Sequence, residues 1–489
     1  MKSKVKTLEK PVFNPYLPSY EYVPDGEPYV FGNRVYVFGS HDKFNGKGFC
    51  EGDYVCWSAS IDDLSNWRND GVIYRRNQDP SNQDGKMVMN APDVQQGVDG
   101  RYYLYYQLGM LATCSVAAAD SPEGPYEFYG YVRHEDGSLF GGSKGDIFCF
   151  DPSVFRDNDG KFYLYVGFSP DRGLLHTIVK LLRRNFDGGF GVELDSDMLT
   201  LRGEPVMVVP GPIKAVGTPF AGHGFYEASS MRKVGDRYYF VYSSILSHEL
   251  CYATSNAPLG SFTYGGTLVS IGDIGYQGRR EADNYTGNTH GGMAEINGQW
   301  YIFYHRQTNK QKCARQGCAE KITFLPDGTI PQVEMTSCGL NEGPLPAVGR
   351  YEARIACNLG SRDGTFPYLR THEKDRKGIH PYFTQSGADR EKDGDQYIAN
   401  MTDGAWAGFK YFAFTGNETE ICVKVRGKAF GTLKVFTEKK RSPAAEIALS
   451  PSVDGERFSA SLSVSFGVWP LYFVYEGNRF FDFFCFEIR

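Results

Sequence analysis

Five segments of the chain share one pattern, a short apolar strand followed by a tight turn and then an aromatic strand. Intervals of 67, 60, 76 and 62 residues separate the centres of the aromatic strands, which are Tyr36, Tyr103, Tyr163, Tyr239 and Tyr301. This is the size of one propeller blade, a four-stranded antiparallel sheet that cannot bury both of its faces alone. Such sheets stack around an axis, so the repeat predicts an all-β fold with a five-bladed β-propeller.

An ionisable residue stands at nearly the same offset before the aromatic strand in every repeat. Offsets of 11, 10, 12, 12 and 11 residues lead back from the last tyrosine to Asp25, Asp93, Asp151, Glu227 and His290. The first strand of each blade lies nearest the axis, and its residues at the axial end face a central channel. The shared offset therefore predicts that these side chains converge on one point.

The repeat ends near Leu345, and the rest of the chain has a different pattern. A chain of 489 residues is too long for one ordinary core. Residues 350–489 contain alternating strands, such as 420–426, 432–436 and 471–475. We therefore expect a propeller over residues 1–345 and a jelly-roll-like β-sandwich over residues 350–489, with the boundary near Pro344–Pro346.

Composition excludes several classes of partner. The net charge is −6 with acids and bases interspersed, so a nucleic-acid partner is not expected. No apolar run reaches membrane-spanning length. Residues 1–10 are polar and lack the apolar core of a signal peptide, and the eleven cysteines have no paired spacing, so we expect a cytoplasmic protein with reduced, buried thiols. The sequence leaves the oligomeric state open.

Three of the five ionisable residues favour a site over a turn. Asp25, Asp151 and Glu227 have aromatic or apolar neighbours, where carboxylates are seldom buried without a partner or a purpose. Asp-Gly and Asp-Pro also form turns, which would be the better interpretation of any one residue alone. The common register reverses that preference for these three, whereas Asp93 is balanced evenly between lining a site and supporting a turn.

Convergent carboxylates suit the chemistry of an inverting glycosidase. One carboxylate activates water, and one carboxylic acid protonates the leaving oxygen. A third carboxylate close by would raise the pKa of the acid by like-charge repulsion. His290 is either a structural histidine or a minority ligand, beside water, of a hard cation such as Ca²⁺.

The motifs that carry these residues resemble those of glycoside hydrolase family 43, whose members are five-bladed propellers. The resemblance covers about residues 10 to 340. Its motifs are Asn14–Pro18, Pro24–Pro28, Arg34–Asp42, Ala91–Val94, Phe150–Phe155, Tyr226–Ser229 and His290–Tyr301. It implies an enzyme that acts on arabinose- or xylose-containing hemicellulose.

The resemblance also implies a division of labour. Asp25 corresponds to the general base, Asp151 to the residue that modulates the pKa of the acid, and Glu227 to the general acid. His290 would lie beside a central calcium ion held largely by waters. Arg315 falls where the family has an arginine that contacts the sugar in the deepest subsite; the alternative is a surface arginine on a strand.

The family pattern leaves a second candidate for the base. The family often has Asp-Pro at this position, but here Gly26 follows Asp25, and Glu27 precedes Pro28. Glu27 would be the base if the alignment slipped by two residues. We prefer Asp25, because placing Pro28 against the next proline-containing strand of the family needs no gap.

The second half of the chain resembles family 6 carbohydrate-binding modules through residues 397–409 and 480–486. Phe480 stands where that family has its ligand asparagine, and no platform tryptophan lies near Arg457 and Phe458. A purely structural sandwich that supports the catalytic rim is therefore an equal alternative to a binding module.

Together these features favour an inverting, exo-acting α-L-arabinofuranosidase that takes hemicellulose-derived oligosaccharides. A β-D-xylosidase is the alternative within the same class, because both substrates present similar hydroxyl patterns. A catalytically silent sugar-binding propeller is the alternative from another class. A protein-interaction propeller fits worst, since it would not need a charged axial cluster. The three retained carboxylates favour the enzyme.

Overall fold

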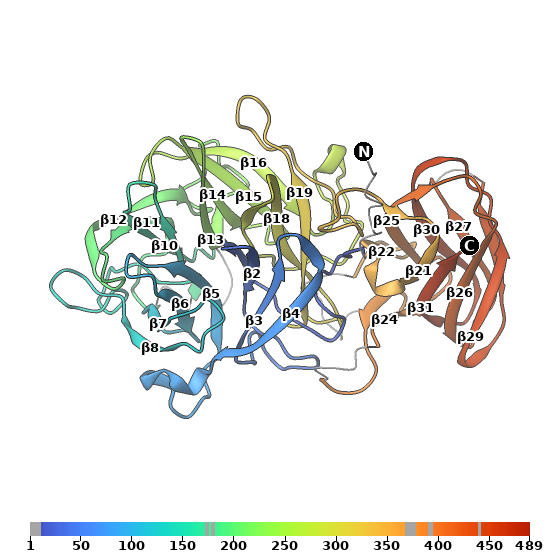
Figure 1. Ribbon diagram of the computed structural model, residues 1–489, viewed down its shortest axis with the longest axis horizontal. Helices are drawn as coiled ribbons and strands as arrows, with labels where there is room; N and C mark the ends of the chain where they lie inside the picture. Colours follow the sequence, from blue (N-terminus) through green and yellow to red (C-terminus); the bar gives the residue numbers. More distant parts are fainter. Residues whose placement is uncertain (1–10, 172–175, 178–180, 367–377, 390–394, 439–441) are drawn as a thin grey trace, which may run out of the picture.

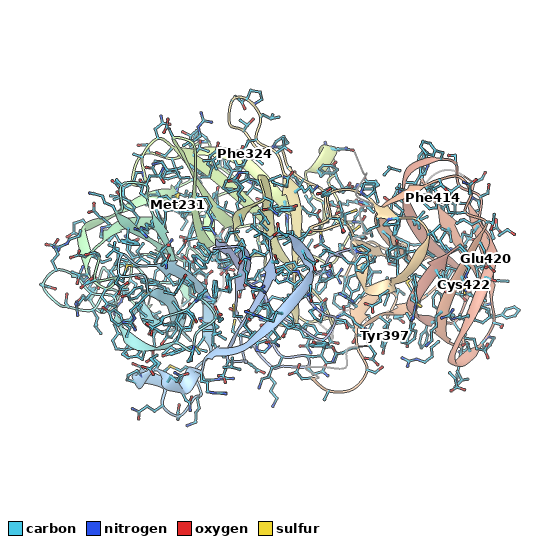
Figure 2. All side chains as sticks on the ribbon, in the orientation of Figure 1. Met231, Phe324, Tyr397, Phe414, Glu420 and Cys422 are labelled. Carbon is cyan, nitrogen blue, oxygen red and sulfur yellow. The ribbon has the colours of Figure 1, made fainter. Side chains whose placement is uncertain are left out.

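The computed structural model describes residues 11–171, 176–177, 181–366, 378–389, 395–438 and 442–489. The propeller and the sandwich lie side by side (Figure 1). Residues 1–10, on which the expected cytoplasmic location rests, lie outside the described residues. Figure 2 shows Met231 in the propeller, and Tyr397, Phe414 and Cys422 in the sandwich.

The first four blades are four-stranded antiparallel sheets, as the repeat predicts. The first holds β1 (Glu27–Phe31), β2 (Arg34–Phe38), β3 (Tyr54–Ser60) and β4 (Asp63–Tyr74). The second holds β5 (Met89–Gln96), β6 (Tyr102–Leu108), β7 (Ser115–Ala119) and β8 (Glu127–Tyr131). The third holds β9 (Ser153–Arg156), β10 (Phe162–Gly167), β11 (Gly188–Leu194) and β12 (Leu201–Pro210). The fourth holds β13 (Phe225–Val234), β14 (Arg237–Ser244), β15 (Glu249–Ser255) and β16 (Thr263–Ser270).

The fifth blade corrects the expectation of four strands in every repeat. Its sheet has three strands, β17 (Met293–Ile296), β18 (Gln299–Gln307) and β19 (Arg315–Ile322). The N-terminal segment lies along β19 instead, where Tyr16 N–H donates to the carbonyl of Gly317 and the Asn14 amide donates to that of Ala319. The two ends of the propeller chain are therefore joined at this blade.

The first strands of the blades ring the axis. β1 contacts β5 and β17, and β9 contacts β5 and β13, although these strands belong to different sheets. Aromatic and aliphatic side chains fill the space between blades, and the five predicted tyrosines lie in the second strands β2, β6, β10, β14 and β18. Residues just before or at the start of each first strand therefore meet at one end of the channel.

The sandwich consists of two sheets around one apolar core. One sheet runs β20 (Leu345–Pro346), β25 (Trp406–Phe414), β30 (Gly467–Asn478), β27 (Phe430–Phe436) and β28 (Ala445–Leu449), with β22 (Asn358–Gly360) paired to β25. The other runs β23 (Tyr382–Thr384), β24 (Tyr397–Met401), β31 (Phe481–Ile488), β26 (Glu420–Gly427) and β29 (Ser452–Ser461), with β21 (Gly349–Glu352) paired to β31. Short 3₁₀ turns are η1 (Arg76–Gln78), η2 (Pro80–Asn82), η3 (Tyr276–Gly278) and η4 (Ala353–Ile355).

Buried polar contacts join the sandwich to the propeller. Arg306 of β18 is fully buried and donates to the backbone carbonyls of Ala356 and Arg354. On the loop before β1, the Tyr22 hydroxyl donates to Gln385 on the sandwich side. Because unpaired buried polar groups are costly, these contacts fix one unit against the other.

No helix in the described residues is long and apolar enough to span a membrane. Every cysteine of the chain is a free thiol in the structure, and all but Cys338 are buried.

Candidate active site

Four of the five predicted residues stand at the same end of the first strands. Asp25, Asp151 and His290 lie two or three positions before β1, β9 and β17, and Glu227 is the third residue of β13. Asp25 and Asp151 have positive φ angles of 58° and 46°. They are therefore turn residues as well as site residues, since strained backbone of this kind persists where surrounding structure imposes it.

Asp151 links the third and fourth blades. Its Oδ2 accepts a hydrogen bond of 3.0 Å from the backbone N–H of Ala228, the residue after Glu227. The same oxygen lies 3.4 Å from Nδ1 of His290. Burial raises the pKa of Asp151, while His290 and the Ala228 N–H oppose this by favouring the charged carboxylate. Asp151 therefore connects the fourth blade to His290, because one of its oxygens contacts both.

Glu227 has the properties of a carboxyl group that holds its proton near neutral pH. Burial, followed by the negative charges of Asp151 and Asp25, raises its pKa to about 8, although His290 acts in the opposite direction. Like charges around one buried carboxyl group disfavour its ionisation. Glu227 and its charged neighbours therefore form one electrostatic cluster.

Asp25 has the opposite environment. Its burial alone would raise its pKa, but the guanidinium of Arg315, together with His305, His290 and the Ser40 hydroxyl, more than offsets this, and the pKa is lowered. Nη1 of Arg315 lies 2.8 Å from Oδ1 of Asp25. The other side of the same guanidinium contacts Asp42, with Nε 2.8 Å from Oδ2 and Nη2 3.0 Å from Oδ1. Arg315 is only 2% exposed, so the alternative of a surface arginine is wrong.

His305 of β18 fixes the backbone of Asp25. Its Nδ1 accepts a hydrogen bond of 3.2 Å from the Asp25 N–H, and its Nε2 lies 2.9 Å from the carbonyl oxygen of Asn288. Burial and the nearby Arg315 lower the pKa of His305 to about 3. The imidazole is therefore neutral, with its proton on Nε2, and it positions Asp25 without competing for its charge.

Glu27 lies further along the axis, where His290 stands between it and Asp151. Its Oε2 accepts hydrogen bonds of 3.0 Å from the hydroxyl of Ser230 and from Nη2 of Arg232. Arg232 also donates to the carbonyls of Met293, Met231 and Pro28. Glu27 is thus paired with a cation of its own. Asp25, and not Glu27, shares the electrostatic cluster of Glu227.

Asp93 neither supports a turn nor lines the catalytic cluster. It lies within β5, is fully buried, and accepts hydrogen bonds from the N–H groups of Val94 and of Val154 in β9. Burial and the charge of Glu27 raise its pKa to about 7, although Arg232 opposes them. Asp93 therefore joins the second and third blades.

Arg232 closes the channel below the cluster. Beyond it, at the opposite end of the axis, lies a cavity of about 200 Å³ lined by residues that include Tyr29, Phe155, Trp300 and Arg232 itself. The Arg232 guanidinium lies 4.6 Å from the centre of the Tyr29 ring. It also donates the hydrogen bonds to Glu27 and to the carbonyls of Met293, Met231 and Pro28. This cavity is therefore separated by Arg232 from the carboxylate cluster.

Aromatic side chains flank two of the carboxylates. Phe150, which precedes Asp151, packs 4.7 Å from Phe168, and Phe168 packs 5.3 Å from Tyr226, which precedes Glu227. Phe150 and Tyr226 are partly exposed. Such rings offer flat apolar surface beside the acids, which suits the C–H faces of a sugar.

The residues at the axis fit a hard cation. Oε1 of Glu27 is buried without a hydrogen-bond partner, and it lies 3.8 Å from Nε2 of His290. Oxygen and imidazole donors at that separation suit two positions in the coordination shell of an ion such as Ca²⁺. Burial lowers the pKa of His290, but Asp151, Asp25 and Glu27 outweigh it and raise the pKa to about 9. Without a cation, the protonated His290 balances the negative charge of the nearby carboxylates. A bound cation would supply this positive charge instead.

Sequence reasoning missed two members of the site. It quoted Asp42 only within a motif, and it passed over His305, although a run of polar residues, His305-Arg306-Gln307, ends the aromatic strand β18. Both are buried, Asp42 at 1% and His305 at 0% exposed. The polar residues at the end of an otherwise apolar strand could have indicated that His305 belongs to a site.

Comparison with known proteins identifies the family. The model of glycosyl hydrolases family 43 matches residues 19–330. The chain belongs to this family. A "Xylosidase/arabinosidase" of Thermoclostridium stercorarium is 49% identical over 477 residues, which cover 96% of this chain and 97% of that protein. An "Arabinoxylan arabinofuranohydrolase" of Paenibacillus polymyxa is 24% identical and covers 94% of this chain and 70% of its own length.

A solved structure of the same family has a similar fold. The crystal structure of a family 43 arabinoxylan arabinofuranohydrolase from Bacillus subtilis aligns over 96% of both chains with a TM-score of 0.51 and 20% identity. That likeness extends through the sandwich as well as the propeller. Both parts of the chain are therefore all-β, and the match to the family model lies within the propeller.

Proposed function

We propose that this family 43 glycoside hydrolase is an inverting, exo-acting enzyme that removes α-L-arabinofuranosyl residues from hemicellulose-derived oligosaccharides. The observation that carries the proposal is the contrast between two carboxyl groups in one cluster, the buried Asp25 and the half-buried Glu227. Glu227 has its pKa raised to about 8, whereas Arg315 holds the pKa of Asp25 low against its burial. Pairs of carboxyl groups whose environments separate their pKa values are suited to acid and base roles.

Each carboxyl group then has one task in a single displacement. Asp25 takes a proton from a water molecule while the water oxygen bonds to the anomeric carbon. The glycosidic bond breaks, and the Glu227 O–H gives its proton to the departing oxygen. Asp151 keeps Glu227 protonated by its charge, and solvent afterwards returns a proton to Glu227 and removes one from Asp25. Arg315, held by Asp42, positions the base and is placed to contact the sugar.

Two features support exo action on short substrates. Arg232 is held across the axis beneath the carboxylates, so a substrate chain would not pass through the channel and would reach them with its end. The aromatic rings of Phe150 and Tyr226 stand beside the acids, where they can pack against a terminal sugar.

A second candidate activity, β-D-xylosidase, is favoured by one comparison. The relative that is 49% identical over nearly the whole chain is named "Xylosidase/arabinosidase". One recess that accepts both sugars would follow from their similar hydroxyl patterns. Sugar binding by the sandwich is a further part of the proposal, although Phe480, half-exposed, stands in place of the expected asparagine.

Hydrolysis of p-nitrophenyl α-L-arabinofuranoside and p-nitrophenyl β-D-xyloside tests the proposed activity. We expect release from both, with the larger kcat/KM for the arabinofuranoside, and a product sugar whose first-formed anomer is inverted in NMR spectra. The folded Glu227→Ala variant is the control for contaminating activity. Release from neither substrate, by a folded protein, would leave the binding-only propeller, and a retained anomer would exclude the direct displacement.

Calcium is part of the proposal, with Glu27 and His290 as the residues that would hold it. Dialysis against a chelator is expected to lower the melting temperature by several degrees, because Glu27 and Asp151 lose a neutralising charge. Added Ca²⁺ restores the loss in the wild type and not in Glu27→Gln, since the variant lacks the carboxylate ligand. Equal melting curves with and without chelator would exclude a stabilising ion at this place.

A further inference from the structure

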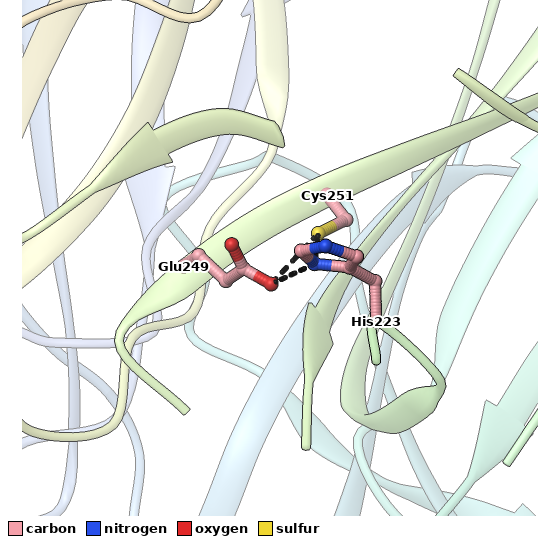
Figure 3. A group of neighbouring side chains, drawn as sticks. All are labelled: His223, Glu249 and Cys251. Atoms are coloured by element: carbon pink, nitrogen blue, oxygen red, sulfur yellow. Dashed lines mark hydrogen bonds and ion pairs between the residues drawn. The ribbon is translucent and has the colours of Figure 1, made fainter. Parts of the chain in front are cut away.

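A second group of potential metal ligands lies in the fourth blade, apart from the axial site. Among the residues that the structure describes, His223, Glu249 and Cys251 bring three ligand atoms within 4.8 Å of one another. His223 lies just before β13, and Glu249 and Cys251 are the first and third residues of β15. Residues two apart on a strand face the same side, so both side chains point at the histidine (Figure 3).

The three atoms lie close together, but a tetrahedral ion with bonds of about 2.0 Å needs its nitrogen and oxygen ligands roughly 3.3 Å apart, so the hydrogen bond between His223 and Glu249 would have to lengthen. Nδ1 of His223 is 2.6 Å from Oε1 of Glu249, Sγ of Cys251 is 3.3 Å from the same oxygen, and Sγ is 4.0 Å from Nδ1. A point equidistant from these atoms lies about 2.0 Å from each, close to Zn–N and Zn–O bond lengths and slightly inside the Zn–S length of about 2.3 Å. An ion could enter with small movements of side chains.

The donor set selects the class of metal. One imidazole nitrogen, one carboxylate oxygen and one sulfur suit a borderline-soft divalent ion such as Zn²⁺, whereas Ca²⁺ and Mg²⁺ prefer oxygen alone. Three protein ligands leave one position of a tetrahedron for water. The ion of this site would therefore differ in kind from the cation that fits the axis.

Neighbouring side chains already hold the ligands in place. The hydroxyls of Ser244 and Thr267 donate to the two oxygens of Glu249, at 2.6 and 3.0 Å. The ring of Tyr264 stacks on His223 with 5.1 Å between centroids and 18° between planes. Partners of this kind orient metal ligands and raise affinity. The His223 side chain is 33% exposed, which provides a route of entry from solvent.

We propose that His223, Glu249 and Cys251 form a binding site for a zinc-class divalent ion on the fourth blade. Binding would release the thiol proton of Cys251 to solvent, and His223 would bind through Nδ1 as neutral imidazole with its one ring proton on Nε2, because thiolate and neutral imidazole are the binding forms. In the metal-free protein the same atoms form a hydrogen-bonded cluster. The ion would tie β15 to the segment that leads, four residues after His223, to Glu227.

Cobalt(II) provides a spectroscopic test on the full-length protein after chelator treatment. One equivalent of Co²⁺ is expected to give a thiolate-to-cobalt charge-transfer band in the near ultraviolet, and one equivalent of Zn²⁺ is expected to remove it. Calorimetric titration with Zn²⁺ should show a stoichiometry of one. Cys251→Ser should abolish the band, and His223→Gln should weaken Zn²⁺ binding at least tenfold.

The matched control is Cys422→Ser, because Cys422 is a buried thiol in the sandwich, away from this blade (Figure 2). That variant should keep both the band and the affinity. Circular dichroism establishes that each variant is folded, and His223→Gln tests the site at a half-exposed position if Cys251→Ser fails to fold. No Co²⁺ band in the wild type, or a band that survives in Cys251→Ser, would overturn the proposal.

Discussion

Asp25→Asn is expected to lower kcat by about 10³-fold, while Glu27→Gln lowers it by less than about tenfold. General base catalysis contributes roughly 10²–10⁴-fold, and asparagine has the shape of aspartate without its charge. Glu27 contacts Arg232 and Ser230 instead of the catalytic cluster. Its loss should therefore lower the melting temperature more than the rate, because it leaves the buried Arg232 without its carboxylate.

Steady-state kinetics and melting curves of the two variants make this comparison. Circular dichroism checks that Asp25→Asn is folded, which we expect because His305 still accepts from the backbone N–H of this residue and Asp42 still pairs with Arg315. A large fall in kcat in Glu27→Gln alone, with Asp25→Asn active, would assign the base to Glu27 and shift the alignment by two residues.

The second large effect concerns Glu227 and pH. The wild-type kcat/KM should fall above pH about 8, because Glu227 must be protonated and its pKa is raised to about 8. On the acid side the rate should persist to a pH below the usual carboxyl range, because Asp25 must be ionised and its pKa is lowered. Glu227→Gln has no titrating group at this position, so the alkaline fall should vanish.

The leaving group provides the second measurement on Glu227. For an oligosaccharide, whose leaving alcohol needs a proton, Glu227→Gln should lower kcat/KM by about 10³-fold, within the range for general acids. For a p-nitrophenyl glycoside the loss should be smaller, because p-nitrophenolate leaves with less help. Equal losses on both substrates would argue against Glu227 as the acid.

Asp151→Asn is the matched control for the pH profile. Removal of one negative charge beside Glu227 lowers the pKa of Glu227, so the alkaline fall should move to lower pH. The variant keeps an oxygen that can accept the Ala228 hydrogen bond. An unchanged profile would mean that Asp151 does not set the pKa of the acid.

Periodicity was sufficient for the blades and for the meeting of four side chains. Each blade repeats a local pattern of apolar strand, turn and aromatic strand. Sheets of this kind bury their faces only against one another, so the repeat also predicts that they stack around a central axis. The fifth blade departs from the repeat, since the N-terminal segment around Tyr16 lies along β19 without adding a strand to its sheet. A contact between residues three hundred positions apart has no local signal.

The same limit explains the site residues. Asp93 has nearly the same offset as the other four, yet a bulge between Asn90 and Asp93 pairs it with Tyr105, two residues after Tyr103, whereas Glu227 pairs with Ser243, four residues after Tyr239. Asp93 therefore lies at another height on the axis, where its carboxylate bonds to the backbone of the next blade. Asp42 and His305 lie outside the repeat register, and only the packed structure shows that they hold Arg315 and Asp25.

The sequence by itself determined the propeller, the second all-β unit, the position of the carboxylates at one end of the channel, and the family. These depend on short-range spacing, which folding preserves. The tertiary structure alone decided which carboxylate is paired with Arg315 and which with Arg232, and why the pKa of Asp25 is lowered while that of Glu227 is raised. The charge of a buried group depends on neighbours from other blades and on the loss of water, and neither is written in the residues beside it.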